Sequence, residues 1–162
     1  MRVSGHHRWP RLLVAGIAAA AVVAVVTVAV RIPADAATGS AIISAASGRC
    51  LDVPGGSTTN GVQPVIWDCN GGTNQRWTVN GQTVQALGKC LDAPLNAAAG
   101  AKAQLWDCNG GTNQQWTLNA DGTIRGVASG LCLDVDHNLT ANGTLVLLWT
   151  CSAAANQRWT RV

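Results

Sequence analysis

The sequence Asn-Gln-x-Trp occurs three times in this chain of 162 residues, and this repetition restricts the possible folds more than any other feature. The copies end at Trp77, Trp116 and Trp159, so the intervals between the tryptophans are 39 and 43 residues. Repeats of this length are typical of folds that are built from several copies of one small unit. The chain is therefore expected to fold by repetition, with one binding site in each copy.

Further signals recur in the same order in each copy. A short apolar segment comes first, and a Cys-Leu-Asp sequence follows it. A glycine then precedes the tryptophan of a Trp-x-Cys segment by six residues. In the three copies these signals stand at 41–44, 50–52 and Gly61/Trp67, at 83–87, 90–92 and Gly100/Trp106, and at 123–127, 132–134 and Gly143/Trp149. With "VNGQT" and "NADGT" as hairpin turns between the copies, the pattern predicts four short strands in each copy and no long helix.

Two all-β architectures use repeats of about 40 residues. A propeller usually has about four to eight blades, and three copies are too few for it. Four strands repeated three times fit a closed β-trefoil, whose closure removes the exposed sheet edges that promote aggregation. We therefore predict an all-β fold, a β-trefoil with twelve short strands in three repeats at about residues 40–79, 80–118 and 119–162.

The first 36 residues differ from the rest of the chain. Basic residues are followed by an apolar run of 19 residues, Leu12–Val30, and then by Ala-Asp-Ala at 34–36. These are the parts of a secretory signal peptide. We predict cleavage near Ala36 and export of one domain, residues 37–162, to the outside of the cell. Because the run is long enough to cross a bilayer, a membrane anchor that stays uncleaved, with an external domain, is the alternative.

All six cysteines belong to the predicted exported domain, as three pairs with spacings of 19, 18 and 19 residues. No Cys-x-x-Cys occurs and no histidine accompanies a pair, so we do not expect a zinc site. Outside the cytosol, cysteines usually form disulfides. Six cysteines can pair in many ways, and only the repeat pattern selects the local pairs. The predicted disulfides, one per repeat, are Cys50–Cys69, Cys90–Cys108 and Cys132–Cys151.

The charge of the exported domain excludes one class of partner. From Ala37 onwards the chain has seven basic residues, seven aspartates and no glutamate, so it is close to neutral. Nucleic-acid binding needs a basic surface, and we do not expect a nucleic-acid partner. A glycosidase usually needs two carboxylates about 5–10 Å apart, but most aspartates here belong to the repeat. His137, the only histidine of the domain, has no nucleophile in a recognisable motif. We expect no catalytic residue, metal or cofactor.

The combination of Cys-Leu-Asp, Trp-x-Cys and Asn-Gln-x-Trp resembles the ricin B-chain type of β-trefoil lectin domain. This family also includes carbohydrate-binding modules of secreted bacterial glycanases. The resemblance covers the chain from about Ser40 to Val162. A single Gln-x-Trp would be weak evidence, but three copies, each with a cysteine pair and an aspartate in register, are specific. The resemblance implies a sugar-binding protein.

Repetition alone does not separate core from site, because a threefold fold repeats both. The resemblance places the tryptophans of Asn-Gln-x-Trp in the shared core, where they are the largest available side chains in a chain without Phe or Tyr. The glutamine of the same motif is expected to hydrogen-bond backbone groups within the fold. These glutamines are Gln75, Gln114 and Gln157.

Three positions in each copy form the candidate sugar site. The aspartate of Cys-Leu-Asp either caps a turn or accepts hydrogen bonds from sugar hydroxyls, and the resemblance favours the sugar. The tryptophan of Trp-x-Cys either extends the core or stacks on a sugar ring, and the resemblance again favours the sugar. The asparagine of Asn-Gln-x-Trp is about as well suited to bind a sugar hydroxyl group as to stabilise a turn. The second copy has one more polar residue, Gln104, at the position that Val65 and Leu147 occupy in the other copies. The candidates are Asp52, Trp67 and Asn74; Asp92, Gln104, Trp106 and Asn113; and Asp134, Trp149 and Asn156.

We therefore predict a secreted monomer with up to three sugar sites, which binds a glycan or polysaccharide of the galactose or xylan type and does not cleave it. A trefoil that binds protein, as an inhibitor does, is an alternative, but it leaves the repeated Asp-Trp-Asn set without a purpose. The second alternative is an accessory binding module of a separate glycoside hydrolase. Membrane contact is expected only if the N-terminal segment stays uncleaved.

Overall fold

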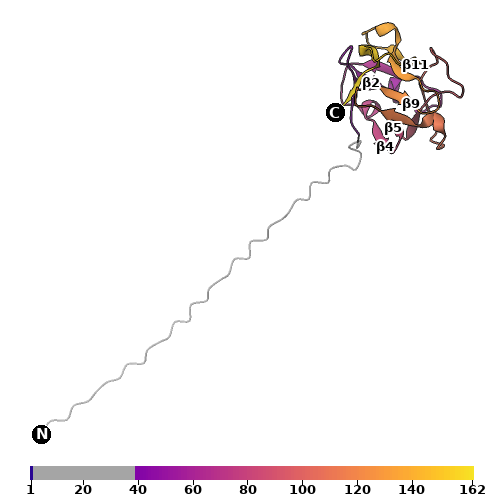
Figure 1. Cartoon of the computed structure of the whole chain (residues 1–162). Helices are drawn as coiled ribbons and strands as arrows, with labels where there is room; N and C mark the ends of the chain where they lie inside the picture. The colour runs from indigo at the N-terminus through magenta and orange to yellow at the C-terminus, as the bar shows by residue number, and fades with distance from the viewer. Residues whose placement is uncertain (2–38) are drawn as a thin grey trace. The chain divides into compact units, whose positions relative to one another are not determined.

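The computed structural model describes Met1 and residues 39–162, so the predicted leader beyond Met1 and its cleavage site lie outside the described residues. Residues 39–162 are built from short strands (Figure 1). The twelve strands are β1 (Ile42–Ser44), β2 (Cys50–Asp52), β3 (Val65–Trp67), β4 (Thr78–Asn80), β5 (Thr83–Ala86), β6 (Lys89–Asp92), β7 (Gln104–Trp106), β8 (Trp116–Leu118), β9 (Ile124–Gly126), β10 (Cys132–Val135), β11 (Thr144–Trp149) and β12 (Trp159–Arg161).

Helical structure in the described part of the chain is limited to five single 3-10 turns. They are η1 (Pro54–Gly56), η2 (Thr73–Gln75), η3 (Thr112–Gln114), η4 (Asp136–Asn138) and η5 (Ala155–Gln157). No helix among the described residues is long and apolar enough to span a membrane. The prediction of twelve strands in three sets of four is confirmed, and both expected hairpin turns join strands that pair with each other, β4 with β5 and β8 with β9.

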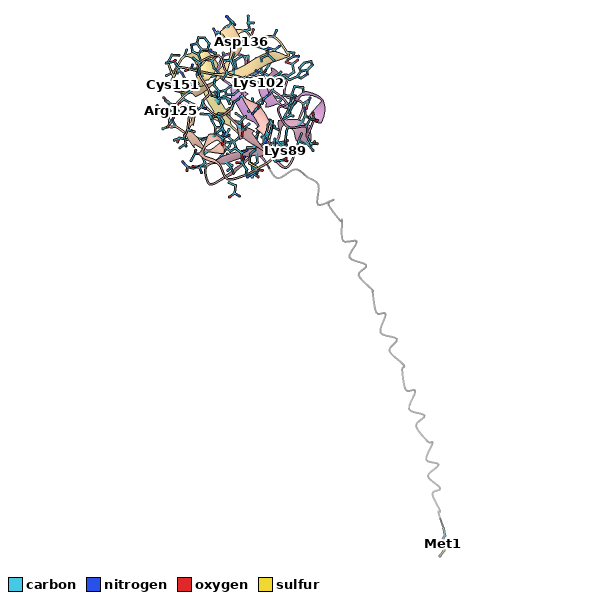
Figure 2. All side chains as sticks on the ribbon, turned by 90° about the vertical axis from the view of Figure 1, so that its right-hand side faces the viewer. Met1, Lys89, Lys102, Arg125, Asp136 and Cys151 are labelled. Atoms are coloured by element: carbon cyan, nitrogen blue, oxygen red, sulfur yellow. A yellow bond between two sulfur atoms is a disulfide. The ribbon has the colours of Figure 1, made fainter. Side chains whose placement is uncertain are left out.

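Pairing between repeats closes the barrel. β1 of the first repeat pairs with β12 of the third, with Ile42 opposite Arg161. Three further contacts join the repeats in a ring: β3 pairs with β11, and isolated bridges join Val62 to Leu105 and Lys102 to Leu147. Each repeat therefore contacts both others, as expected for a closed threefold fold. Figure 2 shows that Lys89 of the second repeat and Asp136 of the third lie at opposite ends of the domain in that view.

The core is made of the apolar positions that recur in each repeat. Leu51 lies opposite Ile66, Leu91 opposite Leu105 and Leu133 opposite Leu148, and all six side chains are fully buried. The tryptophans of Asn-Gln-x-Trp complete this core, with exposed fractions of 0% for Trp77, 1% for Trp116 and 6% for Trp159. Burying a large aromatic side chain is worth several kcal/mol, so these positions stabilise the domain strongly.

Each disulfide joins one strand to the loop that follows the strand paired with it. The bonds are Cys50–Cys69, Cys90–Cys108 and Cys132–Cys151, which confirms the predicted local pairing. In the first repeat Cys50 lies opposite Trp67 and Asp52 opposite Val65. Since side chains alternate between the two faces of a strand, a buried leucine in Cys-Leu-Asp places the cysteine and aspartate together on the other face. The tryptophan of Trp-x-Cys lies on that same face.

Candidate functional site

Three hollows on the domain contain the predicted site residues, one hollow for each repeat. Their volumes are about 330 Å³ at site 1 (Asp52, Trp67, Asn74), 350 Å³ at site 2 (Asp92, Gln104, Trp106, Asn113) and 270 Å³ at site 3 (Asp134, Trp149, Asn156). The structure thus brings every predicted set together, and each hollow is open to solvent. Their role in sugar binding stays a prediction.

The aspartate of each site is buried and held by two side-chain amides. At site 2, Asn113 and Gln114 donate to Oδ2 of Asp92 over 2.8 and 2.9 Å. The amides of Asn74 and Gln75 likewise donate to Oδ2 of Asp52. At site 3, Asn156 donates to Oδ1 and Gln157 to Oδ2 of Asp134. Hydrogen bonds to a carboxylate are about twice as strong as those between neutral groups. The aspartate is therefore fixed in orientation before any ligand arrives.

The asparagine of each site is oriented by a second bond. Nδ2 of Asn113 also donates to the carbonyl oxygen of Ala93, the residue after Asp92, and Asn74 and Asn156 make the equivalent bonds to Val53 and Val135. No described group donates to the carbonyl oxygen of these asparagines. That oxygen, together with the remaining lone pairs of the carboxylate, leaves each site with hydrogen-bond acceptors for a ligand.

The second set of tryptophans is exposed, in contrast to the core set. The exposed fractions are 44% for Trp67, 40% for Trp106 and 48% for Trp149. Each indole lines the hollow that contains the aspartate of its own repeat. A second core layer, the alternative role for these residues, is therefore excluded. We call them the platform tryptophans.

The position opposite the aspartate differs among the sites. Gln104 faces Asp92 across β6 and β7, and its Nε2 donates to Oδ1 of Asp92 over 3.0 Å. Val65 and Leu147 face Asp52 and Asp134. Site 2 is thus the more polar at this position, as the sequence indicates, and three amides rather than two hold its aspartate.

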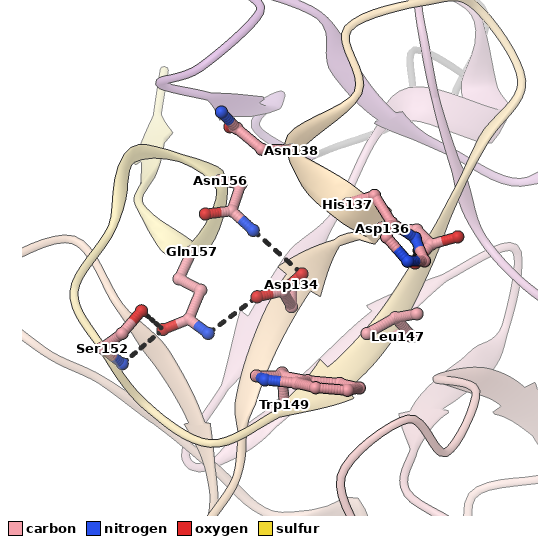
Figure 3. Close-up of a pocket in the computed structure, with 9 residues that line it drawn as sticks. All are labelled: Asp134, Asp136, His137, Asn138, Leu147, Trp149, Ser152, Asn156 and Gln157. Carbon is pink, nitrogen blue, oxygen red and sulfur yellow. Dashed lines mark hydrogen bonds and ion pairs between the residues drawn. The ribbon is translucent and has the colours of Figure 1, made fainter.

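Site 3 has a second carboxylate. Figure 3 shows Asp134 between the amides of Asn156 and Gln157, with Asp136 and His137 on the opposite side of the hollow. Nδ1 of His137 lies 2.6 Å from Oδ1 of Asp136, and the histidine side chain is largely exposed. Burial raises the pKa of Asp134 above its ordinary value, and the charge of Asp136 raises it further, whereas the two amide bonds and His137 lower it.

Two groups of residues at the sites were not anticipated. The glutamines of Asn-Gln-x-Trp do bond the backbone as predicted, through the Asp68, Asp107 and Thr150 carbonyls, but they also hold the site aspartates. The residues after the aspartate line each hollow as well: Pro54 and Gly55, Pro94 and Leu95, and Asp136 to Asn138. Their signal was their place shortly after Cys-Leu-Asp, but apart from the proline shared by the first two copies their residue types differ.

Few ionisable groups line the three hollows. Aspartates and His137 are their only ionisable lining residues among those the structure describes, so no lysine or arginine faces a ligand. Within residues 39–162 no cluster of three or more His, Cys, Asp or Glu side chains is arranged to hold a metal ion. The arrangement offers fixed hydrogen-bond acceptors beside a flat apolar surface.

The chain is similar in sequence to known proteins. A family model described as the ricin-type beta-trefoil lectin domain matches residues 38–159. Nigrin b of Sambucus nigra is 40% identical over 47 residues, which are 28% of this chain and 8% of nigrin b. The chain thus matches only a small part of that protein.

Solved structures match over most of the chain. A designed threefold symmetric protein, ThreeFoil, superposes with a TM-score of 0.70 and 30% identity, over 76% of this chain and 96% of ThreeFoil. A non-toxic homologue of type II RIPs from Momordica charantia, solved in complex with α-methyl-D-galactoside, superposes with a TM-score of 0.66 and 26% identity. That match covers 75% of this chain and 46% of the Momordica chain. The β-trefoil fold is thereby shown.

Proposed function

The chain belongs to the ricin-type beta-trefoil lectin domain family, and we propose from this that residues 37–162 are an exported lectin with three sugar sites, one in each repeat. The ligand class that we propose is a galactose-type glycan or polysaccharide, with xylan-type chains as the second choice. We further propose that the domain acts as a monomer and binds its ligand without cleaving it.

One observation carries this proposal: the same constellation is built three times. Each repeat places a buried, amide-held aspartate and an asparagine beside a half-exposed tryptophan in one hollow. A fold that needed these residues only for stability would have no reason to expose a tryptophan at the same place in each repeat. Large aromatic side chains are normally buried, and an exposed one beside fixed polar groups indicates a ligand site.

The chemistry of the constellation suits a sugar. A pyranose has an apolar C–H face that can stack on an indole, and its hydroxyl groups can donate to carboxylate and amide oxygens at the ring edge. The hollows are at or below the lower end of the range of about 300–1,000 Å³ for small-molecule pockets, which suits one or two sugar units rather than a deeply buried chain. Galactose is supported by the Momordica homologue, which was solved with α-methyl-D-galactoside.

Binding without cleavage is supported by the number of carboxylates. Hydrolysis of a glycosidic bond usually requires a pair of them on either side of the bond. Among residues 39–162, Asp52 and Asp92 are the only carboxylates that line their hollows. Site 3 has both Asp134 and Asp136, so it is the place where a hydrolysis assay would be most informative.

The proposal is tested by binding to immobilised galactan and xylan. The exported protein is compared with a triple variant in which Trp67, Trp106 and Trp149 are changed to Ala. The matched control is Val127→Ala/Leu139→Ala/Leu145→Ala, which shortens three exposed apolar side chains that line none of the three hollows. The tryptophan variant should lose retention on one of the polysaccharides, while the control and the wild type are retained equally.

Other results would favour the alternatives. Retention that is equal in the tryptophan variant would remove the platform from the proposed site. A wild type that binds neither polysaccharide, nor any glycan of a broad array, would favour a protein partner instead. Release of reducing sugar from either polysaccharide would contradict binding without cleavage.

A further inference from the structure

A turn of the first repeat holds the platform tryptophan of the second. Oδ1 of Asn60 accepts a bond from the backbone N–H of Asp107, the residue after Trp106, and Nδ2 of Asn60 donates to the Asp107 carboxylate over 2.7 Å. The next residue, Gly61, donates from its N–H to the carbonyl oxygen of Leu105, the residue before Trp106. The dipeptide Asn60–Gly61 is thus bonded to both neighbours of the tryptophan.

The glycine of this turn also lies against the indole. A methyl group at Gly61 would lie 3.6 Å from Cζ3 of Trp106, so the turn runs along the edge of the ring. The φ angle of Gly61 is +86°, which residues with a side chain rarely adopt. Lys89 completes the arrangement by bonding to both Oδ1 of Asn60 and the Asp107 carboxylate. We call Asn60, Lys89 and Asp107 the 1–2 clamp.

The third repeat holds the platform tryptophan of the first in the same way. Oδ1 of Asn142 accepts from the N–H of Asp68, the residue after Trp67, and its Nδ2 donates to the Asp68 carboxylate, both over 2.8 Å. Gly143 donates to the carbonyl oxygen of Ile66, the residue before Trp67. Arg49 pairs with the Asp68 carboxylate and donates to Oδ1 of Asn142. Arg49, Asp68 and Asn142 form the 3–1 clamp.

The corresponding junction between the second and third repeats lacks these polar groups. Gly100 still donates to the carbonyl oxygen of Leu148, the residue before Trp149. However, the residue before Gly100 is Ala99, the residue after Trp149 is Thr150, and the position of the cation is taken by Leu131. Trp149 is therefore held by the turn on one side only.

We propose that Asn60 and Asn142 are positioning residues, which hold the platform tryptophans of sites 2 and 1 at the orientation that a sugar requires. Sites 1 and 2 are then each completed by a side chain of another repeat, whereas site 3 is not. This inference rests on the proposed sugar-binding function, and it adds residues that contact the neighbours of the platform rather than the sugar itself.

The asparagines carry the effect rather than the ion pairs. The carboxylates of Asp68 and Asp107 are about two-thirds exposed, and exposed ion pairs contribute little. Each asparagine makes two bonds to a single residue, one to its backbone and one to its carboxylate, which restricts that residue more than a flexible cation does. The bond from Lys89, followed by that from Asn60, holds the pKa of Asp107 below its ordinary value, so the acceptor stays charged.

Platform orientation matters because a sugar has to meet two fixed groups at once. The aspartate is held by amides and cannot follow a displaced indole. If the strand end that carries the tryptophan is free to move, binding has to order it first, and the cost lowers affinity. The loss of one or two hydrogen bonds corresponds to roughly a two- to tenfold change in a dissociation constant.

The test resolves the three sites within one molecule. The exported protein is labelled with ¹⁵N, and the indole N–H signals of the platform tryptophans are assigned and followed during titration with galactose. Asn60→Ala should raise the dissociation constant of site 2 roughly two- to tenfold and leave sites 1 and 3 unchanged. Asn142→Ala should have the same effect on site 1 alone. Without sugar, each variant should increase the fast motion of its own platform indole in ¹⁵N relaxation.

A gain-of-function variant tests the inference independently of any loss of stability. Ala99→Asn/Thr150→Asp transfers the asparagine and its carboxylate to the third junction. It should tighten galactose binding at site 3 relative to wild type, by a similar factor. The matched control is Ala98→Asn/Thr150→Asp, which places the same side chains one residue out of register and should leave site 3 unchanged.

The outcomes separate this inference from the proposed function. If galactose shifts no indole signal in the wild type, galactose binding is wrong, but the relaxation measurements still test the clamps. Variants that lower the melting temperature while all three dissociation constants and indole motions stay as in wild type would show that the clamps only stabilise the fold. Equal weakening at all three sites would contradict the inference as well.

Discussion

The indole N–H of Trp116 donates a hydrogen bond to the carbonyl oxygen of Leu91 over 2.9 Å, and Leu91 directly precedes Asp92. The other two repeats make the equivalent bond. The core tryptophan therefore fixes the strand from which the site aspartate projects. A core residue, Leu91, and a site residue, Asp92, are thus neighbours on one strand. Because the core tryptophans are buried and the platform tryptophans are exposed, the two kinds should respond differently to replacement.

Trp116→Ala should unfold or severely destabilise the domain. Removal of a fully buried aromatic side chain costs about 3–5 kcal/mol, and the Leu91 carbonyl also loses its partner. Trp106→Ala should leave the melting temperature close to that of wild type and weaken sugar binding, because this indole is partly exposed. Thermal melts and galactose titrations of both variants check the contrast. Similar destabilisation by the two changes would make the platform assignment wrong.

Replacement of the site aspartates should weaken binding in proportion to their number. Asp52→Ala, Asp92→Ala and Asp134→Ala should each reduce binding to a polysaccharide more than to a monosaccharide, because a long chain can use several sites at once. The triple variant should bind neither. Asp92→Ala should have the largest single effect, since three amides lose their acceptor there.

The control for this series is Asp121→Ala. Asp121 bonds Thr123 and lines none of the three hollows, so its loss should not change retention on the polysaccharide. Each site variant removes one acceptor from each amide that holds the aspartate, although the Asn and Gln amides keep their bonds to backbone carbonyls. A cost of roughly 1–3 kcal/mol in stability is expected alongside. A folded triple variant that still binds polysaccharide at full strength would remove the aspartates from the site.

Loss of one disulfide should lower the stability of the domain by about 2–5 kcal/mol. The double change Cys90→Ala/Cys108→Ala removes the bond that joins β6, which carries Asp92, to the loop after Trp106. Site 2 should therefore lose affinity in addition to the general loss of stability. Chemical denaturation gives the free energy of unfolding, and peptide mapping without reduction checks that the two remaining bonds are unchanged. Links between repeats would contradict the pairing described above.

Acidification should release sugar from site 3 at a pH above 3.8, the ordinary pKa of an aspartate. Burial and then the charge of Asp136 raise the pKa of Asp134, so it takes up a proton early and loses its negative charge as an acceptor. Asp136→Asn should lower the midpoint. Titration with galactose, read at the Trp149 indole between about pH 3 and 7, checks both shifts.

The raised pKa of Asp134 affects the stability of the fold in the opposite direction, because low pH favours the folded state. A raised pKa means that the folded domain binds this proton more tightly than the unfolded chain does. The contribution of Asp134 to stability is therefore most favourable below 3.8 and declines as the pH rises through the folded pKa. In the galactose titration, a midpoint for sugar release below pH 3.8 would show that burial does not dominate the pKa of Asp134.

The repeats allowed the fold and most of the site to be predicted, because positions with a common physical purpose recur in all three copies. Leu51 and Ile66 had to be buried, and alternation along the strands then placed Asp52 and Trp67 on the outer face. The disulfide pairs followed from the same register. The three tryptophans of each kind were separable only by resemblance, since spacing does not reveal which of two repeated indoles is buried.

The 1–2 and 3–1 clamps could not be predicted by comparing the three repeats. Asn60 and Asn142 have Ala99 as their counterpart, so the asparagine does not recur in every repeat. Their partners lie 47 and 74 residues away in the sequence, and only the closed barrel brings them together. The bond between Gln114 and Asp92 was missed for a related reason: a glutamine can satisfy its amide in many ways, and its choice depends on the final geometry.

The pairing of β1 with β12 brings the two ends of the domain together as neighbouring strands of one sheet. The barrel can then close whichever repeat comes first in the chain. A short linker from Val162 to Gly39, with a new start and end in the hairpin turn at Asn80–Gly81, would leave every strand pair intact. Such a circular permutant should fold and retain all three hollows, so the threefold ring of contacts, rather than the choice of the repeat that comes first, defines this molecule.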